Sequence, residues 1–316
     1  MTRISRALAA VAAAVSMLAP AARADTEAFV TNQLGDSLSV VDLATSAAVA
    51  EIKVGGHPAG IALSPDKTQA YITAPDSKEL VFFDAVGRKV TGRMPAGAGP
   101  LGIAVNPVSG IVYVADWYKH EVLAIDPKTR AVVKRVNVGD APSGIAVTPD
   151  GKVVLTADRD SNQVSFIDAA SLTRTATVNV GTRPFGVSID KAGARAYVTN
   201  VMSNDVSVID LATRTIVATI KVGSRPYGIA FAKGKGFVTN QGNATVSVID
   251  LGQGHVVKTL RVDDYPEGIA ADTAEGSVFV SCWSDNSLVE IDAETLEIKH
   301  RIPVGNGPRS FGAFLR

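Results

Sequence analysis

Residues 184–223 read PFGVSIDKAGARAYVTNVMSNDVSVIDLATRTIVATIKVG. Four short runs rich in Val, Ile and Thr alternate here with turn residues, which is the pattern of strands in an antiparallel meander. Copies of this unit lie on both sides of it, and each opens on a proline. The prolines stand 40 to 42 residues apart, at Pro58, Pro100, Pro142, Pro184, Pro226, Pro266 and Pro308. A period of this length is typical of repeat arrays and propellers.

The repeat predicts an all-β fold, a seven-bladed β-propeller with four antiparallel strands in each blade. No window beyond residue 24 shows sustained helical periodicity. Residues 27–32 match a second strand with no first strand before it, and residues 308–314 match a first strand with nothing after it. We therefore expect the C-terminal strand to pair with the N-terminal blade and close the ring, which removes an exposed edge.

Two further positions recur with a physical reason. An aspartate ends the third strand of every unit, where its carboxylate can accept hydrogen bonds from turn amides: Asp42, Asp84, Asp126, Asp168, Asp210, Asp250 and Asp292. A glycine follows the fourth strand in six units, where we expect a positive φ: Gly55, Gly97, Gly139, Gly181, Gly223 and Gly305. Recurrence in every copy favours a structural role over a catalytic one.

Residues 1–24 have the features of a secretory signal peptide. Arg3 and Arg6 precede an apolar stretch over residues 7–18, and Ala22-Arg23-Ala24 offers a small-x-small cleavage site. The sequence therefore predicts export to the periplasm or the exterior, with residues 25–316 forming a single propeller domain. No other apolar run approaches the roughly 18 residues that a transmembrane helix needs, so no transmembrane segment is expected.

Composition restricts the classes of partner and cofactor. The chain has 31 basic and 31 acidic residues, and removal of residues 1–24 would leave a net charge of about −3, which argues against a nucleic-acid binder. The single cysteine, Cys282, permits no intramolecular disulfide. The four histidines show no metal-ligand spacing, so we expect no metal and no cofactor. We expect a monomer.

The second and third strands carry a family resemblance. Residues 196–200 read AYVTN, residues 28–32 read AFVTN, and VSVID recurs at 206–210 and 246–250. These runs resemble the repeat of the YVTN-type β-propellers over the whole of residues 25–316. The resemblance implies an exported bacterial protein. Some such propellers look like partners of periplasmic quinoprotein dehydrogenases or transport systems, and related ones include surface-layer proteins.

Function in a repeat protein is expected where the copies differ. In a propeller, the crossovers between blades and the loops between second and third strands surround one mouth of the central channel. The variable residues there include four basic side chains, His57, Arg183, Arg225 and Arg309. They also include five aromatic ones, Phe185, Tyr227, Tyr265, Trp117 and Trp283.

Two interpretations of these residues are open. Arginines facing one mouth suit a carboxylate, a phosphate or an acidic protein loop, and aromatic side chains can anchor a protein partner. Alternatively, the arginines are solvated rim residues whose stems cover apolar strand ends.

The leading functional hypothesis is a non-catalytic exported scaffold that binds a protein partner or a small anionic ligand at the channel mouth. The sequence has no nucleophile elbow, phosphate loop or dinucleotide fingerprint. Its innermost strands are interpreted as Gly-Ile-Ala-like, so we expect no acid–base side chains on them. Cys282, beside Trp283, is interpreted as a packing residue. The alternatives are a lactonase-like propeller hydrolase, an accessory subunit of a quinoprotein dehydrogenase, and a structural protein of the cell envelope.

Overall fold

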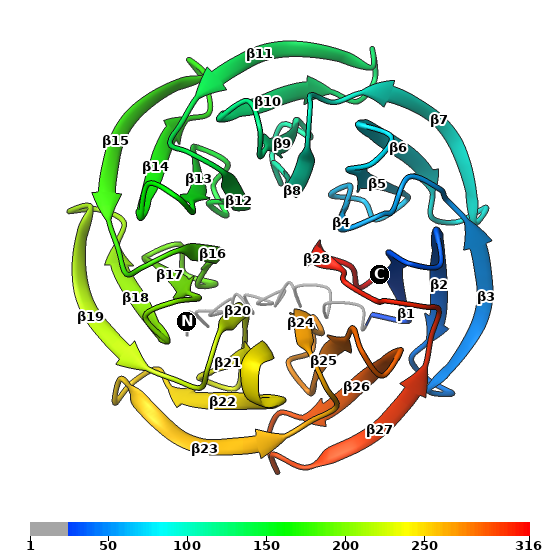
Figure 1. The fold of residues 1–316 in the computed structure, drawn as a ribbon, viewed down its shortest axis with the longest axis vertical. Helices are drawn as coiled ribbons and strands as arrows, with labels where there is room; N and C mark the ends of the chain where they lie inside the picture. Colours follow the sequence, from blue (N-terminus) through cyan, green and yellow to red (C-terminus); the bar gives the residue numbers. More distant parts are fainter. Residues whose placement is uncertain (1–24) are drawn as a thin grey trace, which may run out of the picture.

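The computed structural model describes residues 25–316, so the predicted signal peptide lies outside the described residues. Its 28 strands form seven sheets arranged as blades around a central channel (Figure 1). This arrangement confirms the predicted seven-bladed propeller. Within the described residues, no helix has the length and hydropathy needed to cross a membrane.

Apart from β28, the strands occupy equivalent places in the seven blades. Blades 1 to 7 are numbered here by their second strands. The innermost strands are β4 (Gly60–Leu63), β8 (Pro100–Val105), β12 (Pro142–Val147), β16 (Pro184–Ile189), β20 (Pro226–Ala232), β24 (Pro266–Ala271) and β28 (Phe311–Ala313). The second strands are β1 (Glu27–Asn32), β5 (Gln69–Ala74), β9 (Val112–Asp116), β13 (Val153–Asp158), β17 (Arg195–Asn200), β21 (Lys235–Asn240) and β25 (Ser277–Cys282). The third strands are β2 (Ser37–Asp42), β6 (Glu79–Asp84), β10 (Glu121–Asp126), β14 (Gln163–Asp168), β18 (Asp205–Asp210), β22 (Thr245–Asp250) and β26 (Ser287–Asp292). The outer strands are β3 (Ala47–Lys53), β7 (Lys89–Pro95), β11 (Ala131–Asn137), β15 (Thr173–Asn179), β19 (Thr215–Lys221), β23 (His255–Arg261) and β27 (Ile298–Pro303), and a short 3-10 turn, η1, covers Gln241–Asn243.

The hydrophobic core lies between neighbouring blades. Leu80 and Phe82 of blade 2, for example, pack in one buried cluster with Val112 and Val114 of blade 3. The seven aspartates that end the third strands all accept backbone hydrogen bonds within the next turn, as predicted. In blade 5, the Asp210 carboxylate accepts from the amides of Ala212 and Thr213, and this bonding lowers the pKa of Asp210.

A hydroxyl in the second strand connects successive blades. Thr239 Oγ1 donates to the carbonyl of Glu267 in the next blade at 2.9 Å and accepts the Gly228 amide at 3.0 Å. Thr31, Thr73, Thr199 and Ser281 make the same donation across the neighbouring interfaces. These side chains therefore hold the innermost strands in register around the channel.

We expect Thr239→Val to lower the free energy of unfolding by about 1–3 kcal/mol, because it leaves a buried carbonyl and a buried amide without their partner. The control is Thr219→Val on the exposed outer strand β19, which should change stability by less than about 0.5 kcal/mol. Urea denaturation measures both, and equal effects of the two substitutions would contradict the role assigned to the hydroxyl.

The last residue of the second strand differs between blades. It is Asn in blades 1, 5 and 6, whereas Asp158 takes the place in blade 4. Asp158 is fully buried, and its Oδ1 has no partner among the described residues. Burial raises the pKa of Asp158 above its ordinary value of 3.8.

We expect Asp158→Asn to stabilise the fold at neutral pH by about 1 kcal/mol or more. Because the folded pKa is raised, the native state binds the proton more tightly than the unfolded state. The contribution of Asp158 therefore favours folding at low pH and is lost as the pH rises through the folded pKa. The asparagine variant should abolish this loss, which urea titrations at several pH values would show.

A matched substitution should have the opposite sign. The Asp116 carboxylate accepts four backbone amides, those of Ala98, Gly99, Tyr118 and Lys119. An asparagine replaces one of the two carboxylate oxygens with an NH₂ group, which cannot accept a hydrogen bond. At least the Ala98 amide, which donates to Oδ2, would then lose its partner, so Asp116→Asn should destabilise the fold by about 1 kcal/mol or more. Stabilisation by both substitutions, or by neither, would contradict this account.

The C-terminal segment closes the ring, as predicted. Pro308 and Leu315 form antiparallel bridges with Asn32 and Ala28 of β1, and the Phe29 amide donates to the carbonyl of Phe314 at 2.9 Å. Phe314 is fully buried. The N-terminal blade therefore takes its innermost strand from the other end of the chain.

This closing segment departs from the other blades in its register. In blade 5, Ile189 pairs with Ala196 when Pro184 pairs with Asn200. In blade 1 the equivalent place, opposite Ala28, is taken by Leu315, which lies two residues further from its proline. The extra length lets β28 move away from β1 and pair in parallel with β4 of blade 2, as its position near the centre of Figure 1 shows.

Candidate functional site

In the crossovers between blades, the backbone conformation recurs and hydrogen bonds to loop side chains stabilise it. The residue before the proline has a positive φ in six of them: His57, Ala141, Arg183, Arg225, Tyr265 and Gly307. The Arg183 amide donates to Asn162 Oδ1 at 2.7 Å, and the Arg225 amide donates to Asn204 Oδ1 at 2.8 Å. We call the surface formed by these crossovers and the loops between second and third strands the crossover face.

The expectation of a positive φ at the glycine after each fourth strand is wrong in four of six units. Of those glycines, only Gly55 and Gly97 have a positive φ. The positive φ lies instead at the residue before the proline, whose backbone amide can donate a hydrogen bond to a loop side chain. The sequence gives little sign of this because that residue varies from copy to copy.

Three aromatic rings meet at the channel mouth. The Phe185 ring centroid lies 4.5 Å from that of Tyr227 and 5.1 Å from that of Phe311. Tyr227 and Phe311 lie 6.4 Å apart with nearly parallel rings. Phe185 and Tyr227 belong to blades 5 and 6, whereas Phe311 reaches them from β28 because of the longer closing segment. We call these three residues the aromatic cluster.

A partly buried ion pair adjoins the aromatic cluster. Arg309 Nε lies 2.9 Å from Glu267 Oε2, and Nη2 lies 3.3 Å from Oε1. Glu267 is only 1 % exposed and also accepts the Gln241 side-chain amide at 2.6 Å. The Arg309 guanidinium also lies over the Phe311 ring, 5.3 Å from its centroid. The charge of Arg309 is therefore neutralised within the protein.

The other predicted site residues form separate pairs on the same face. Tyr265 and Trp283 have ring centroids 6.2 Å apart. The Arg159 guanidinium lies over Trp117 at 5.2 Å.

The remaining basic residues have different partners. His57 Nδ1 contacts the Asp76 carboxylate, and Arg183 Nε lies 3.8 Å from Asp160 Oδ1. Within residues 25–316 the Arg225 guanidinium forms no ion pair. The four predicted basic residues therefore do not share one anion-binding centre.

Sequence reasoning missed Phe311, Glu267 and Gln241. The expectation that the innermost strands carry no acid–base side chains is wrong at Glu267, which lies in β24. One signal could have indicated the Glu267–Arg309 pair, because these residues follow the proline in consecutive units and so occupy equivalent places in neighbouring blades. Opposite charges at such positions predict an ion pair.

Exposed apolar side chains from several different blades lie on the crossover face. Leu34, Tyr118 and Met202 lie in loops between second and third strands and are 49 %, 68 % and 57 % exposed. Tyr265 lies in a crossover and is 45 % exposed. Exposed apolar groups rimmed by polar residues are common at protein interaction sites.

The described residues support neither a reactive thiol nor a metal site. Cys282 is buried, and burial raises the pKa of its thiol, so the reactive thiolate form is disfavoured. Among residues 25–316, no group of three or more His, Cys, Asp or Glu side chains is placed to hold a metal ion.

These features define a β-propeller with an aromatic channel mouth, and comparison with known proteins assigns its family. A family model of YNCE-like β-propellers matches residues 91–313, which is more than half of the chain. The protein therefore belongs to the YNCE-like β-propeller family. A search of curated proteins finds no significant match.

Solved structures share the fold at low sequence identity. A functionally unknown protein from Desulfotomaculum acetoxidans superposes with a TM-score of 0.78 at 16 % identity, covering 90 % of this chain and 99 % of that one. Kuenenia stuttgartiensis hydrazine synthase gives 0.73 at 23 % identity, covering 80 % and 88 %. Dihydro-heme d1 dehydrogenase NirN in complex with DHE gives 0.68 at 16 %, covering 90 % and 74 %.

Proposed function

We propose that this propeller is an exported, non-catalytic scaffold that binds a protein partner through its crossover face. The observation that carries the proposal is that exposed Tyr, Met and Leu side chains lie on the same face as Trp117 and Trp283. Aromatic residues and Met are enriched in protein interfaces, and Tyr, Trp and Arg dominate their binding energy. Export rests on the signal-peptide features of residues 1–24.

The rigidity of the face supports a binding role. Backbone amides of the crossovers are held by loop side chains, as at Arg183 and Arg225, so few groups need to be ordered when a partner docks. Less ordering on binding leaves more of the contact energy for affinity.

The distribution of charge favours a protein over a small free anion. Arg309 is paired with Glu267, and Arg183 lies near Asp160, which leaves Arg225 without an ion pair among residues 25–316. One available guanidinium suits a single carboxylate on a partner surface, where neighbouring apolar contacts add to the affinity. The solved structures named above share the fold only, so their activities lend no support to an enzymatic function.

The test uses the processed protein, residues 25–316, immobilised and exposed to a periplasmic extract of the source bacterium. A partner captured by the wild type is identified, purified and titrated against Tyr118→Ala/Tyr265→Ala. We expect this double substitution to raise the Kd by about tenfold or more, because each ring is a candidate hot spot.

The matched control is Val108→Ala/Val217→Ala, which removes exposed apolar side chains away from the crossover face, at 71 % and 51 % exposure. This variant should bind as the wild type does. The proposal fails if no protein is captured specifically, or if both double variants bind the partner equally well.

A further inference from the structure

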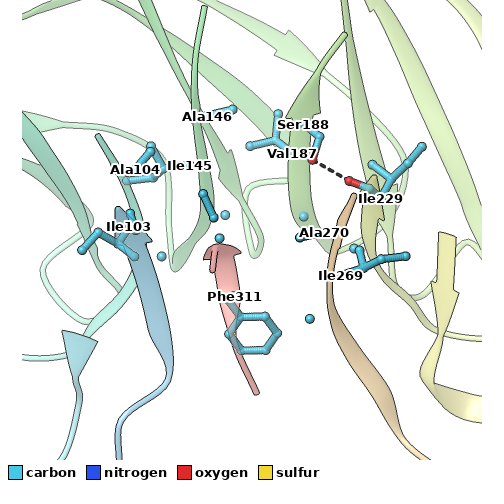
Figure 2. Close-up of a pocket in the computed structure, with 18 of the residues that line it drawn as sticks. Ile103, Ala104, Ile145, Ala146, Val187, Ser188, Ile229, Ile269, Ala270 and Phe311 are labelled. Carbon is cyan, nitrogen blue, oxygen red and sulfur yellow. Dashed lines mark hydrogen bonds between the residues drawn. The ribbon is translucent and has the colours of Figure 1, made fainter. Parts of the chain in front are cut away.

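The central channel contains an apolar cavity of about 400 Å³. Small side chains of the innermost strands, Ala104, Ala146 and Ala270, leave this space, and Ile and Val residues surround them (Figure 2). Phe311 lies at one end of the cavity, where it belongs to the aromatic cluster. Pockets that hold small molecules have volumes of about 300–1,000 Å³ and mostly apolar walls.

One wall of the cavity is formed by β28, which departs from the repeat. The closing segment is two residues longer than its counterparts, β28 pairs with β4, and the Phe311 ring contacts Phe185 of blade 5. The same segment places Ala313 in the cavity wall with its side chain exposed. Gly312, between them, has φ +114° and lies so close to the Ile61 carbonyl that a Cβ would meet it at 2.4 Å. The segment is therefore fixed in this position.

The cavity wall presents no free charge. Among residues 25–316, Glu267 is the one charged residue that lines it, and Arg309 neutralises this carboxylate. Both serines of the wall donate their hydroxyl protons to backbone carbonyls, Ser143 to Phe185 and Ser188 to Ile229, each at 2.9 Å. An ionic ligand would lose its hydration here without gaining a partner, which is unfavourable.

We propose that this cavity is a binding site for a neutral, planar aromatic molecule. The aromatic cluster supplies ring faces and edges for stacked or edge-to-face contact, and the Ala, Ile and Val walls exclude water from the rest of the ligand. The site is separate from the protein-binding surface proposed above, because it depends on Ala313 and the channel interior and not on Tyr118 or Tyr265.

The probe for this site is phenylnaphthylamine, a neutral aromatic compound whose fluorescence rises in apolar surroundings. We expect saturable binding to residues 25–316 with one molecule per chain. Ala313→Trp fills the cavity and should raise the Kd by about tenfold or more. Ala131→Trp, at an exposed position of the outer strand β11, is the matched control and should bind as the wild type does.

A second variant and a second probe make the result decisive. Phe311→Ala removes one wall of the aromatic cluster and should also weaken binding, with circular dichroism confirming that each variant is folded. Anilinonaphthalene sulfonate, the anionic analogue, should bind more weakly than the neutral probe. The inference is overturned by non-saturable binding, by equal affinity of the two Trp variants, or by tighter binding of the sulfonate.

Discussion

Deletion of residues 309–316 is expected to lower the free energy of unfolding by more than about 5 kcal/mol, which would leave many domains of ordinary stability largely unfolded. The deletion removes the buried side chains of Phe314 and Leu315. It also removes the backbone hydrogen bonds to β1 and the carbonyl of Arg309 that accepts from Ser281. The N-terminal blade would keep three strands with an open inner edge. Thermal melting followed by circular dichroism measures the loss.

A point substitution separates side-chain burial from strand pairing. Phe314→Ala keeps the backbone hydrogen bonds but empties a fully buried site, so we expect a loss of about 3–5 kcal/mol. Leu34→Ala, at a side chain that is 49 % exposed, is the control and should cost less than about 0.5 kcal/mol. A truncated protein that melts at the wild-type temperature would refute closure of the ring by this segment.

The second large effect is expected at Gly102, where the innermost strands crowd the channel axis. A Cβ on Gly102 would lie 1.7 Å from the backbone carbonyl oxygen of Ser143 in the next blade. Neither atom can move without displacing a strand, so Gly102→Ala should cost about 3 kcal/mol or more. Urea denaturation compares the variant with the wild type.

Gly276 provides the matched control for this substitution. It lies in a turn between first and second strands and has no positive φ, and a Cβ added there would come no closer than 3.7 Å to another atom. Gly276→Ala should therefore change stability by less than about 0.5 kcal/mol. Similar losses for the two substitutions would show that crowding at the axis is not the reason for the glycine at position 102.

The repeat made the fold predictable because each strand is marked by local chemistry. The prolines mark the innermost strands, and the aspartates that end the third strands accept turn amides in all seven blades. Closure was predictable because residues 27–32 and 308–314 are complementary parts of one unit. In each case, the relevant contacts lie within one repeat or between equivalent positions of two repeats.

The candidate site was less predictable because it depends on departures from the repeat. The sequence of residues 308–314 looks like another innermost strand, so nothing local indicates that β28 leaves β1 and pairs with β4, or that the Phe311 ring contacts Phe185. The arginines could be assigned to one face, but their ion-pair partners come from other blades. Glu267, for example, lies 42 residues from Arg309 and removes it from the set of available cations.

The left-handed backbone before six of the seven prolines limits which side chains can occupy these crossover positions. Side chains branched at Cβ are strongly disfavoured at positive φ, whereas unbranched and small residues are tolerated better. The six residues found there are His, Ala, Arg, Arg, Tyr and Gly, and none is Val, Ile or Thr. Substitutions at these six positions can therefore change the size, charge or aromatic character of the side chain, provided that the new side chain is not branched at Cβ.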